Sequence, residues 1–259
     1  IPGSGTTNRD GNNAMSKNNS LKYLAESLVD KGIATYRYDK TVLNFTPADT
    51  AKINALNFDM LIKEASDVID FFKKQDQFSK VIVAGHSQGS LVGMIAAVDR
   101  SDAFISLAGM GRSVDVLLEE QIAKQAPVLL DETKRVLKEL RNGNTVDDYN
   151  PFLANLFNKS VQPFLISYMK YNPASEIGKL KQPVLIVQGD NDIQISVTDA
   201  EILHKACAQS KIVLIQKMNH LFKKIEGERA ENMASYANPD LPIMEELTFN
   251  LVQFINELN

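Results

Sequence analysis

Short apolar runs alternate with longer amphipathic stretches along most of this chain. Runs rich in β-branched residues occupy positions 33–38, 81–84, 103–107, 183–188 and 211–216, and each has the length of a buried strand. Strands that alternate with amphipathic helices are joined by right-handed crossovers, which build a mostly parallel sheet flanked by helices. The pattern therefore predicts an α/β fold.

The stretches between these runs carry apolar residues at helical spacing. Residues 54–75 repeat an apolar stripe with lysines and carboxylates on the opposite side, which is typical of a helix that covers a sheet. Further helices are expected after Ser20, a candidate capping residue, and at 198–208 and 243–258. The stretch 227–242 contains glycine, asparagine and proline and predicts a long loop.

The alternation stops between residues 112 and 181, where helical patterns are separated by prolines and a glycine and no stretch has the features of a strand. We expect a helical cap at 112–181, inserted into an α/β core formed by residues 1–111 and 182–259. An inserted cap has two surfaces to cover, so we expect some of its apolar residues to line a substrate pocket, while the others pack inside it. The pocket candidates are Tyr168, Met169 and Tyr171.

Composition and charge narrow the classes of function. The chain has 259 residues, of which 44% are hydrophobic and 23% charged, as in ordinary globular proteins. Its net charge of −4 argues against nucleic acid or an anionic membrane as a partner. No apolar run approaches the roughly 20 residues of a membrane span. The single cysteine, Cys207, excludes an internal disulfide and a cysteine-based metal site.

The pentapeptide Gly85-His86-Ser87-Gln88-Gly89 follows one apolar run and precedes another. This order of strand, sharp turn and helix is the context that a Gly-x-Ser-x-Gly nucleophile elbow requires. Glycines on both sides of the serine let the strand and the helix approach closely, and Ser87 would lie at the helix N-terminus, where N–H groups can receive a developing negative charge. Ser87 is therefore the candidate nucleophile, and the alternative is a turn that merely needs glycine.

A serine nucleophile needs a base that takes its proton. The chain has three histidines, and only His220 directly follows a predicted strand. His86 precedes the serine and is expected to pack under the turn, and His204 lies in the middle of a predicted helix. The order of serine, acid and histidine along the chain agrees with His220 as the base.

The base in turn needs a carboxylate that fixes its tautomer. Asp190 and Asp192 both follow the run at 183–188, and Asp190 fits a role in the turn. Asp192 lies further out, where the loop can curl toward the histidine, and we favour it as the acid. The oxyanion is expected to bind two backbone N–H groups, from Gln88 after the nucleophile and from Ser4 in the glycine-rich N-terminal loop.

Residues 2–12 read Pro-Gly-Ser-Gly-Thr-Thr-Asn-Arg-Asp-Gly-Asn. With this motif, the pentapeptide, Tyr38-Asp39-Lys40, Asn219-His220 and Tyr236-Ala237-Asn238-Pro239, the sequence resembles the α/β-hydrolase superfamily, and within it the bacterial serine esterases that carry this oxyanion loop. The resemblance spans nearly the whole chain. It implies hydrolysis of small-molecule carboxylic esters, best tested on short acyl chains, with no metal or organic cofactor. It also implies that Asp192 supplies the acid.

Two features depart from that family pattern. Thr41-Val42-Leu43 stand where members usually have Arg-Gly, so we expect a different pocket floor. The strands that normally precede the oxyanion loop are absent, which would leave a sheet edge unpaired. The chain begins at Ile1, in what reads as a strand end, so we expect an upstream segment to have been removed or left out. The location stays open between the cytoplasm and, after cleavage of a signal peptide, the periplasm or the exterior.

Three functions fit these residues. The first is hydrolysis of a small ester through an acyl-enzyme formed on Ser87. The second is hydrolysis of an amide or a peptide by the same residues, which makes a greater demand on His220 to protonate the leaving group. The third is a binding protein that kept the fold and lost the activity.

Overall fold

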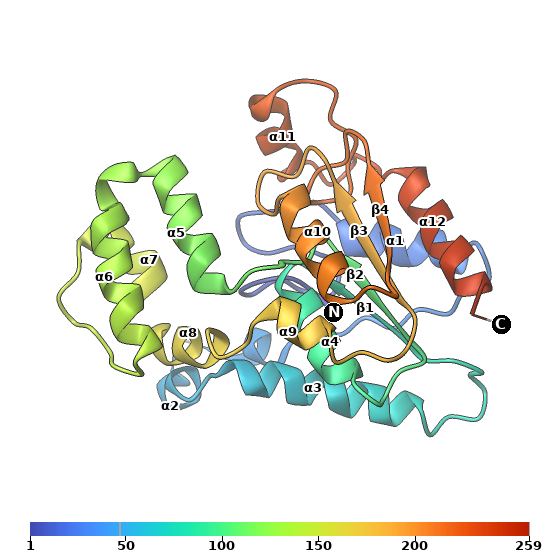
Figure 1. Cartoon of the computed structure of the whole chain (residues 1–259), viewed down its shortest axis with the longest axis horizontal. Coiled ribbons are helices and arrows are strands. Elements are labelled where there is room, and N and C mark those ends of the chain that lie inside the picture. The colour runs from blue at the N-terminus through green and yellow to red at the C-terminus, as the bar shows by residue number, and fades with distance from the viewer. Residues whose placement is uncertain (47, 259) are drawn as a thin grey trace.

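The structure is a computed structural model that describes residues 1–46 and 48–258. Within these residues, a parallel sheet of four strands lies at the centre, and the strands are adjacent in the order in which they occur along the chain (Figure 1). Each strand falls on an apolar run that predicts it. The strands are β1 (Ile82–His86), β2 (Ala103–Leu107), β3 (Val184–Gly189) and β4 (Lys211–Ile215).

Helices cover both faces of the sheet, as the α/β-hydrolase resemblance implies (Figure 1). Four helices pack on one face: α3 (Phe58–Phe72), α4 (Gln88–Ala97), α9 (Pro173–Ile177) and α10 (Val197–Ala206). On the other face lie α1 (Ser20–Val29) and α12 (Glu245–Asn256). Alternate residues of β2 serve the two faces, because side chains of a strand point to opposite sides in turn: Phe104 packs with α4, and Ile105 packs with α1 and α12.

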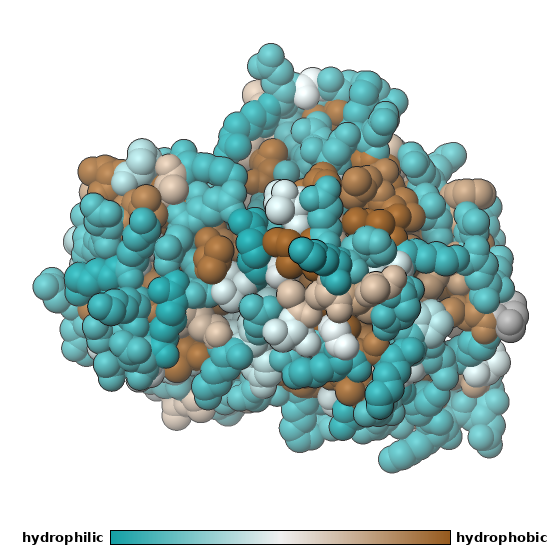
Figure 2. Space-filling model, in the orientation of Figure 1, coloured by the Kyte–Doolittle hydropathy of each residue, from teal (hydrophilic) through white to brown (hydrophobic). Residues whose placement is uncertain are grey.

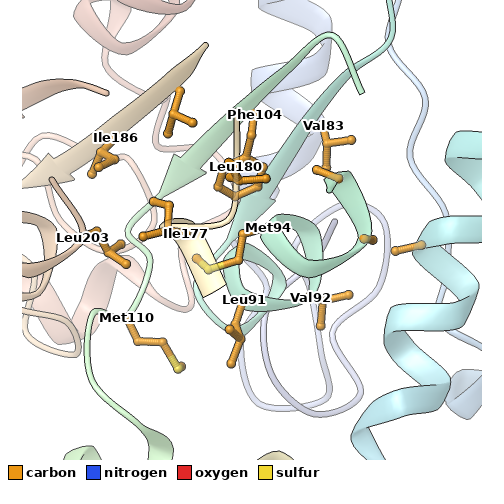
Figure 3. Close-up of a cluster of buried hydrophobic side chains, with 14 of the residues drawn as sticks. Val83, Leu91, Val92, Met94, Phe104, Met110, Ile177, Leu180, Ile186 and Leu203 are labelled. Carbon is orange, nitrogen blue, oxygen red and sulfur yellow. The ribbon is translucent and has the colours of Figure 1, made fainter. Parts of the chain in front are cut away.

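Helix α4, which carries the residues after Ser87, is buried on nearly all sides. It lies between the sheet and α3, so that Leu91 and Met94 are completely buried in the cluster that also holds Phe104 of β2 and Ile186 of β3 (Figure 3). Burial of one such side chain contributes about 1.5–3 kcal/mol to stability. The position of the turn at Ser87 is therefore fixed by the centre of the core.

The region from 112 to 181 forms helices, and the described residues contain no strand there. Most of these helices lie to one side of the sheet, at the left of Figure 1, and pack on one another around Val136, Leu140 and Phe157, which are fully buried. Helix α9 instead packs on α4 and α10. The division at 112 and 181 stays a prediction. The helices at the side are α5 (Val114–Gln125), α6 (Leu130–Arg141), α7 (Ala154–Phe157) and α8 (Gln162–Tyr168).

The prediction of a strand at 33–38 was wrong, because this segment has no regular secondary structure. A strand needs a neighbouring backbone that exchanges hydrogen bonds with it. Here a cavity of about 570 Å³ lies between the segment and β1, with Ala34 and Tyr36 on one side and Ile82 and Ala84 on the other.

Two further boundaries differ from the prediction. The expected loop at 227–242 contains a short helix, α11 (Arg229–Ser235). The expected helix at 54–75 begins later, at Phe58, because the side chain of Asn57 caps it by accepting the N–H of Met60 at 3.1 Å, and a separate short helix, α2 (Thr50–Asn54), precedes it.

The face of the molecule shown in Figure 2 is mostly hydrophilic, with hydrophobic side chains in small groups. None of the helices in residues 1–46 and 48–258 is long and apolar enough to cross a membrane. The same described residues hold no cluster of three or more histidine, cysteine or acidic side chains that could bind a metal ion.

Candidate active site

Ser87 stands at the turn between β1 and α4 with φ 55° and ψ −123°, a backbone conformation that a residue with a side chain rarely adopts. Its N–H donates to the carbonyl oxygen of Leu107 on β2 at 2.9 Å, which ties the turn to the sheet. Glycine makes the turn possible, because a Cβ on Gly85 would lie only 2.1 Å from the carbonyl oxygen of Gly89. Strand and helix thus meet as the pentapeptide predicts.

His220 and Asp192 are joined directly. Nδ1 of His220 lies 2.7 Å from Oδ2 of Asp192, and the two side chains are 4% and 1% exposed. Oδ1 of Asp192 accepts the N–H groups of Gln194 and Ile195 at 2.7 and 3.0 Å. Burial alone would raise the pKa of Asp192, but the charge and hydrogen bond of His220 and the two N–H groups outweigh it and hold this pKa below its ordinary value. An ionised Asp192 requires Nδ1 of His220 to be the donor, which leaves Nε2 as the acceptor for a proton.

The neighbouring aspartate has another role. Oδ1 of Asp190 accepts the N–H of Lys217 at 2.6 Å, which closes the turn after β3. The side chain of Gln188, at the end of the same strand, donates to Oδ2 of Asp192 at 3.1 Å. The structure therefore brings Asp192, and not Asp190, to His220.

His86 holds the loop of His220 against the turn at Ser87. Its Nε2 donates to the carbonyl oxygen of His220 at 2.9 Å, and the two rings are 4.7 Å apart. Burial, and then the proximity of His220, lowers the pKa of His86 to about 3, so the ring is neutral and donates a single proton. The expectation that His86 packs under the turn is confirmed. Among the described residues no partner hydrogen-bonds the Ser87 hydroxyl, so the serine is linked to His220 through its neighbour His86.

The N-terminal loop lies against the same turn. The backbone nitrogen of Ile1 donates to the carbonyl oxygen of Ala84 at 2.7 Å, and the carbonyl of Ile1 accepts the N–H of His86 at 3.0 Å. A Cβ on Gly3 would lie 3.4 Å from Cβ of Ser87. Ser4, the next residue of this loop, therefore stands close to the serine.

Polar side chains of the loop hold its own backbone. The hydroxyl of Thr7 donates to the carbonyl oxygen of Ser4 at 2.8 Å, and Oδ1 of Asn8 accepts the N–H groups of Asp10 and Asn12, both at 3.0 Å. These bonds account for the run of small and polar residues at 2–12. Two further side chains attach the loop to the segment after residue 36: Arg9 donates two hydrogen bonds to Asp39, and Arg37 pairs with Asp10.

Tyr168 of α8 reaches toward the turn. It is buried and stacks on Phe58 of α3, with ring centroids 4.3 Å apart and planes 5° from parallel. Its hydroxyl donates to Sδ of Met110 at 3.0 Å and also interacts with the side chain of Gln88. Burial raises the pKa of Tyr168, so the hydroxyl keeps its proton.

The two other pocket candidates lie elsewhere. The hydroxyl of Tyr171 donates to Asp59 at the start of α3, and Met169 packs into the apolar cluster of α6 and α8. The third histidine, His204, shares a hydrogen bond of 2.8 Å with Ser210, at the far end of α10.

Arg112 joins α5 to the core. Its guanidinium donates to both carboxylate oxygens of Asp199 on α10, at 2.9 and 2.7 Å, and to Glu120 of α5 at 2.7 Å. Beside it, a cavity of about 660 Å³ extends between α5, α11 and the loop that carries Asp192. Asp192 is the one member of the candidate triad among its lining residues.

Sequence reasoning gave no role to Lys40, Gln188 or the carbonyl contact of His86. Lys40 does appear in the Tyr38-Asp39-Lys40 motif, but nothing in the motif says what its side chain contacts. In the structure Lys40 is 3% exposed and its ammonium group donates to the carbonyl oxygens of Gly3 and Gly5.

The fold and the turn at Ser87 together define the class of this protein. A parallel sheet between helices, with the strand–turn–helix at β1 and loops that gather beyond the carboxyl ends of the strands, is the α/β-hydrolase fold. Solved structures agree at the level of the fold. The chain is similar to Est1E from Butyrivibrio proteoclasticus (TM-score 0.56, 18% identity, 92% of this chain and 82% of that one) and to a bromoperoxidase from Bacillus anthracis (TM-score 0.53, 16% identity, 95% and 90%).

The family model described as serine aminopeptidase, S33, matches residues 15–152, which is more than half of the chain. The protein belongs to this family of α/β-hydrolases. It is also 25% identical over 243 residues to esterase EstD from Thermotoga maritima, in an alignment that covers 88% of this chain. The chain spans about half the length of that relative, 55%.

Proposed function

We propose that this protein hydrolyses small carboxylic esters with short acyl chains, through an acyl-enzyme formed on Ser87. The observation that carries the proposal is the buried pair of His220 and Asp192, 2.7 Å apart, held by the His86 contact beside a serine in a strained turn. A structural histidine would not need an ionised carboxylate, two supporting N–H groups and a second histidine to orient it. The name of the esterase EstD supports the ester as substrate.

The proposed reaction has two steps, formation of the acyl-enzyme and its hydrolysis, and the same residues act in both. Nε2 of His220 takes the proton of the Ser87 hydroxyl as its oxygen attacks the ester carbonyl, and Asp192 balances the charge that forms on the imidazole. The N–H groups of Ser4 and Gln88 bind the oxyanion. His220 then gives its proton to the leaving alcohol. Water, activated by the same histidine, attacks the acyl group and releases the acid.

The cap residues are proposed to border the substrate. Of the three pocket candidates, Tyr168 has the strongest support, because its hydroxyl interacts with the side chain of Gln88 next to the nucleophile. Met169 and Tyr171 stay predictions, since their contacts are with the cap cluster and with Asp59.

The substitution Ser87→Ala tests the proposal. We expect it to lower kcat on p-nitrophenyl acetate and butyrate by about 10⁵-fold or more, because no other group can form the acyl-enzyme. It should also abolish labelling by a fluorophosphonate probe. The control is Ser79→Ala, on the surface before β1, which should keep both. Equal ester hydrolysis by the parent protein and Ser87→Ala would refute the proposed function.

A peptide or amide substrate is the second candidate, because the matching family is described as serine aminopeptidase. The same residues would serve, but an amine is a poorer leaving group than an alcohol and depends more on protonation by His220. Matched ester and anilide substrates with the same acyl group separate the two. A kcat/KM for the anilide that equals or exceeds that for the ester would favour the peptidase.

A further inference from the structure

Lys40 is a buried cation that donates hydrogen bonds to two backbone carbonyl groups. Its side chain is 3% exposed, and its ammonium group donates to the carbonyl oxygen of Gly3 at 2.6 Å and to that of Gly5 at 2.5 Å. Lysine is almost never fully buried unless it has partners, because removing the charge from water is costly. Both partners of Lys40 belong to the loop that lies against Ser87.

These two hydrogen bonds fix the direction of two backbone N–H groups. In a planar trans peptide, the C=O of one residue and the N–H of the next point in opposite directions. With the carbonyl of Gly3 turned toward Lys40, the N–H of Ser4 must point away from Lys40. The hydroxyl of Thr7 holds the next peptide by donating to the carbonyl oxygen of Ser4 at 2.8 Å. The orientation of the Ser4 N–H is thus set from both sides.

Flexible loops rich in glycine and serine otherwise have many accessible backbone conformations. Gly5 in this loop has a φ of +64°, in the left-handed region, and its carbonyl is one of the two that Lys40 holds. Without the hydrogen bond from Lys40 to the carbonyl of Gly3, the Gly3–Ser4 peptide plane could rotate. The Ser4 N–H would then no longer point in the one direction that binding of a developing charge requires.

We propose that Lys40 is a positioning residue that locks the Gly3–Ser4 peptide so that the Ser4 N–H faces the oxyanion formed at Ser87. The proposal rests on the proposed function, since it concerns the same site. Lys40 does not touch the substrate. It acts through the loop, so its removal should weaken binding of the transition state more than binding of the ester.

Among the described residues, a single carboxylate acts on the charge of Lys40. Glu64 of α3 lies close enough to raise the pKa of Lys40, and one of its oxygens, Oε2, is buried without a hydrogen-bond partner among the described residues. Its other oxygen accepts the N–H of Thr41 at 3.2 Å.

Burial outweighs the effect of Glu64 and lowers the pKa of Lys40 to about 8. Below this pH the ammonium makes charge-assisted hydrogen bonds, which are about twice as strong as neutral ones. Above it the neutral amine holds the two carbonyls more weakly. We therefore expect kcat to decline as the pH rises through 8.

Lys40→Met tests whether Lys40 locks the Gly3–Ser4 peptide, a role called the lock below, because methionine keeps the approximate length and volume of the side chain and removes its hydrogen-bond donors. The matched control is Lys63→Met, at an exposed ion pair on α3. We expect Lys40→Met to lower kcat on p-nitrophenyl acetate by about 10- to 100-fold, since loss of an oxyanion donor costs about 100-fold or more and misplacement of a reacting group by 1 Å about 100-fold. KM should change less than threefold, and Lys63→Met should match the parent protein.

Two readouts separate this role from general damage to the fold. The parent should hydrolyse an ester faster than the matching thionoester, because sulfur accepts hydrogen bonds poorly, and Lys40→Met should lose most of this preference. The decline of kcat near pH 8 should also disappear. If Lys40→Met does not fold, Glu64→Gln decides, because removing the carboxylate should lower the pKa of Lys40 and move the decline to lower pH.

The outcomes are distinct. Parental kcat in folded Lys40→Met, an unchanged ester to thionoester ratio, or a pH profile that Glu64→Gln leaves in place would overturn the lock while Ser87→Ala still abolishes activity. A parent protein that neither hydrolyses esters nor reacts with a fluorophosphonate at Ser87 would overturn the proposed function and the lock with it.

Discussion

The contact between Gly85 and Gly89 is the tightest point of the turn that carries Ser87, and Gly85→Ala perturbs it with a single methyl group. The added Cβ would lie 2.1 Å from the carbonyl oxygen of Gly89 and 2.7 Å from Cα of Ser90. Both atoms belong to the backbone of α4, which is packed between the sheet and α3 and cannot yield as a side chain does. To reach an ordinary contact, β1 and α4 must separate by about 1 Å.

The two expected effects follow from this displacement. Forcing a methyl group into a packed interior costs about 1–3 kcal/mol in the free energy of unfolding. Displacing the serine by about 1 Å relative to His220 and the N–H groups proposed to bind the oxyanion should cost about 100-fold in rate. We therefore expect folded Gly85→Ala to have a kcat/KM about 100-fold below the parent on p-nitrophenyl acetate, with a modestly lower melting temperature.

Gly32→Ala is the matched control, because it is destabilising for a different reason. Gly32 follows α1 with a φ of +79°, and a Cβ there would meet no atom within 4 Å. An alanine in this left-handed conformation costs about 1–2 kcal/mol without moving the site. Melting curves and esterase kinetics on both variants decide the matter. Parental kcat/KM in Gly85→Ala, or an equal loss of activity in Gly32→Ala, would refute the reasoning.

Two further predictions concern ionised groups. Asp192→Asn should lower kcat by about 10³- to 10⁴-fold, because an amide favours the wrong tautomer of the histidine, whereas Asp190→Asn should stay within a few-fold of the parent; equal losses in the two would contradict the assignment. Arg112→Met should lower the free energy of unfolding by about 2–3 kcal/mol, because it leaves the fully buried carboxylate of Asp199 without its ion-pair partner. Arg135→Met, which removes the exposed ion pair of Arg135 with Glu132, should lower the free energy of unfolding by less than about 1 kcal/mol in chemical denaturation. Equal losses in Arg135→Met and Arg112→Met would contradict the argument.

The strands were predictable because each follows an apolar run, and β2 and β3 are buried along their whole length. The run at 103–107 has the same bounds as β2, and all five of its residues are buried. The segment at 33–38 has a similar composition but did not become a strand. An apolar composition indicates that a segment can be buried, but a strand also needs a neighbouring backbone with which to form hydrogen bonds. A cavity of about 570 Å³ lies where that neighbour would be.

The helix α11 was missed for a different reason. It spans Arg229–Ser235, fewer than two full turns, so no apolar stripe can repeat within it, and the glycine and asparagine around it indicate a loop. Its role comes from contacts across the chain: the amide of Asn219 donates to Asn232 at 3.1 Å and to Ser235 at 2.8 Å, which steadies the loop that carries His220. Contacts between residues far apart in sequence leave no periodic signal.

In the candidate site, the proposed catalytic side chains were predictable from the sequence, but the contacts that support them were not. The pentapeptide and the chain order predict Ser87, Asp192 and His220, and the structure brings the last two together. The supporting contacts were not predictable, because Lys40 and His86 act on carbonyl groups, and any residue type can supply a carbonyl. A sequence names the donors of such contacts but not their backbone acceptors.

Glycine at the strand ends is what allows these distant loops to meet. Gly85, near the end of β1, lies against the first turn of α4. Gly189, the last residue of β3, lies against the loop after β4, and a Cβ on it would be 2.0 Å from the carbonyl oxygen of Met218. Asp192 follows the second glycine by three residues and His220 follows Met218 by two. A methyl group at Gly189 would therefore push the two catalytic candidates apart, just as one at Gly85 would displace the serine. The pairing of acid and base depends on a backbone contact that contains neither of them.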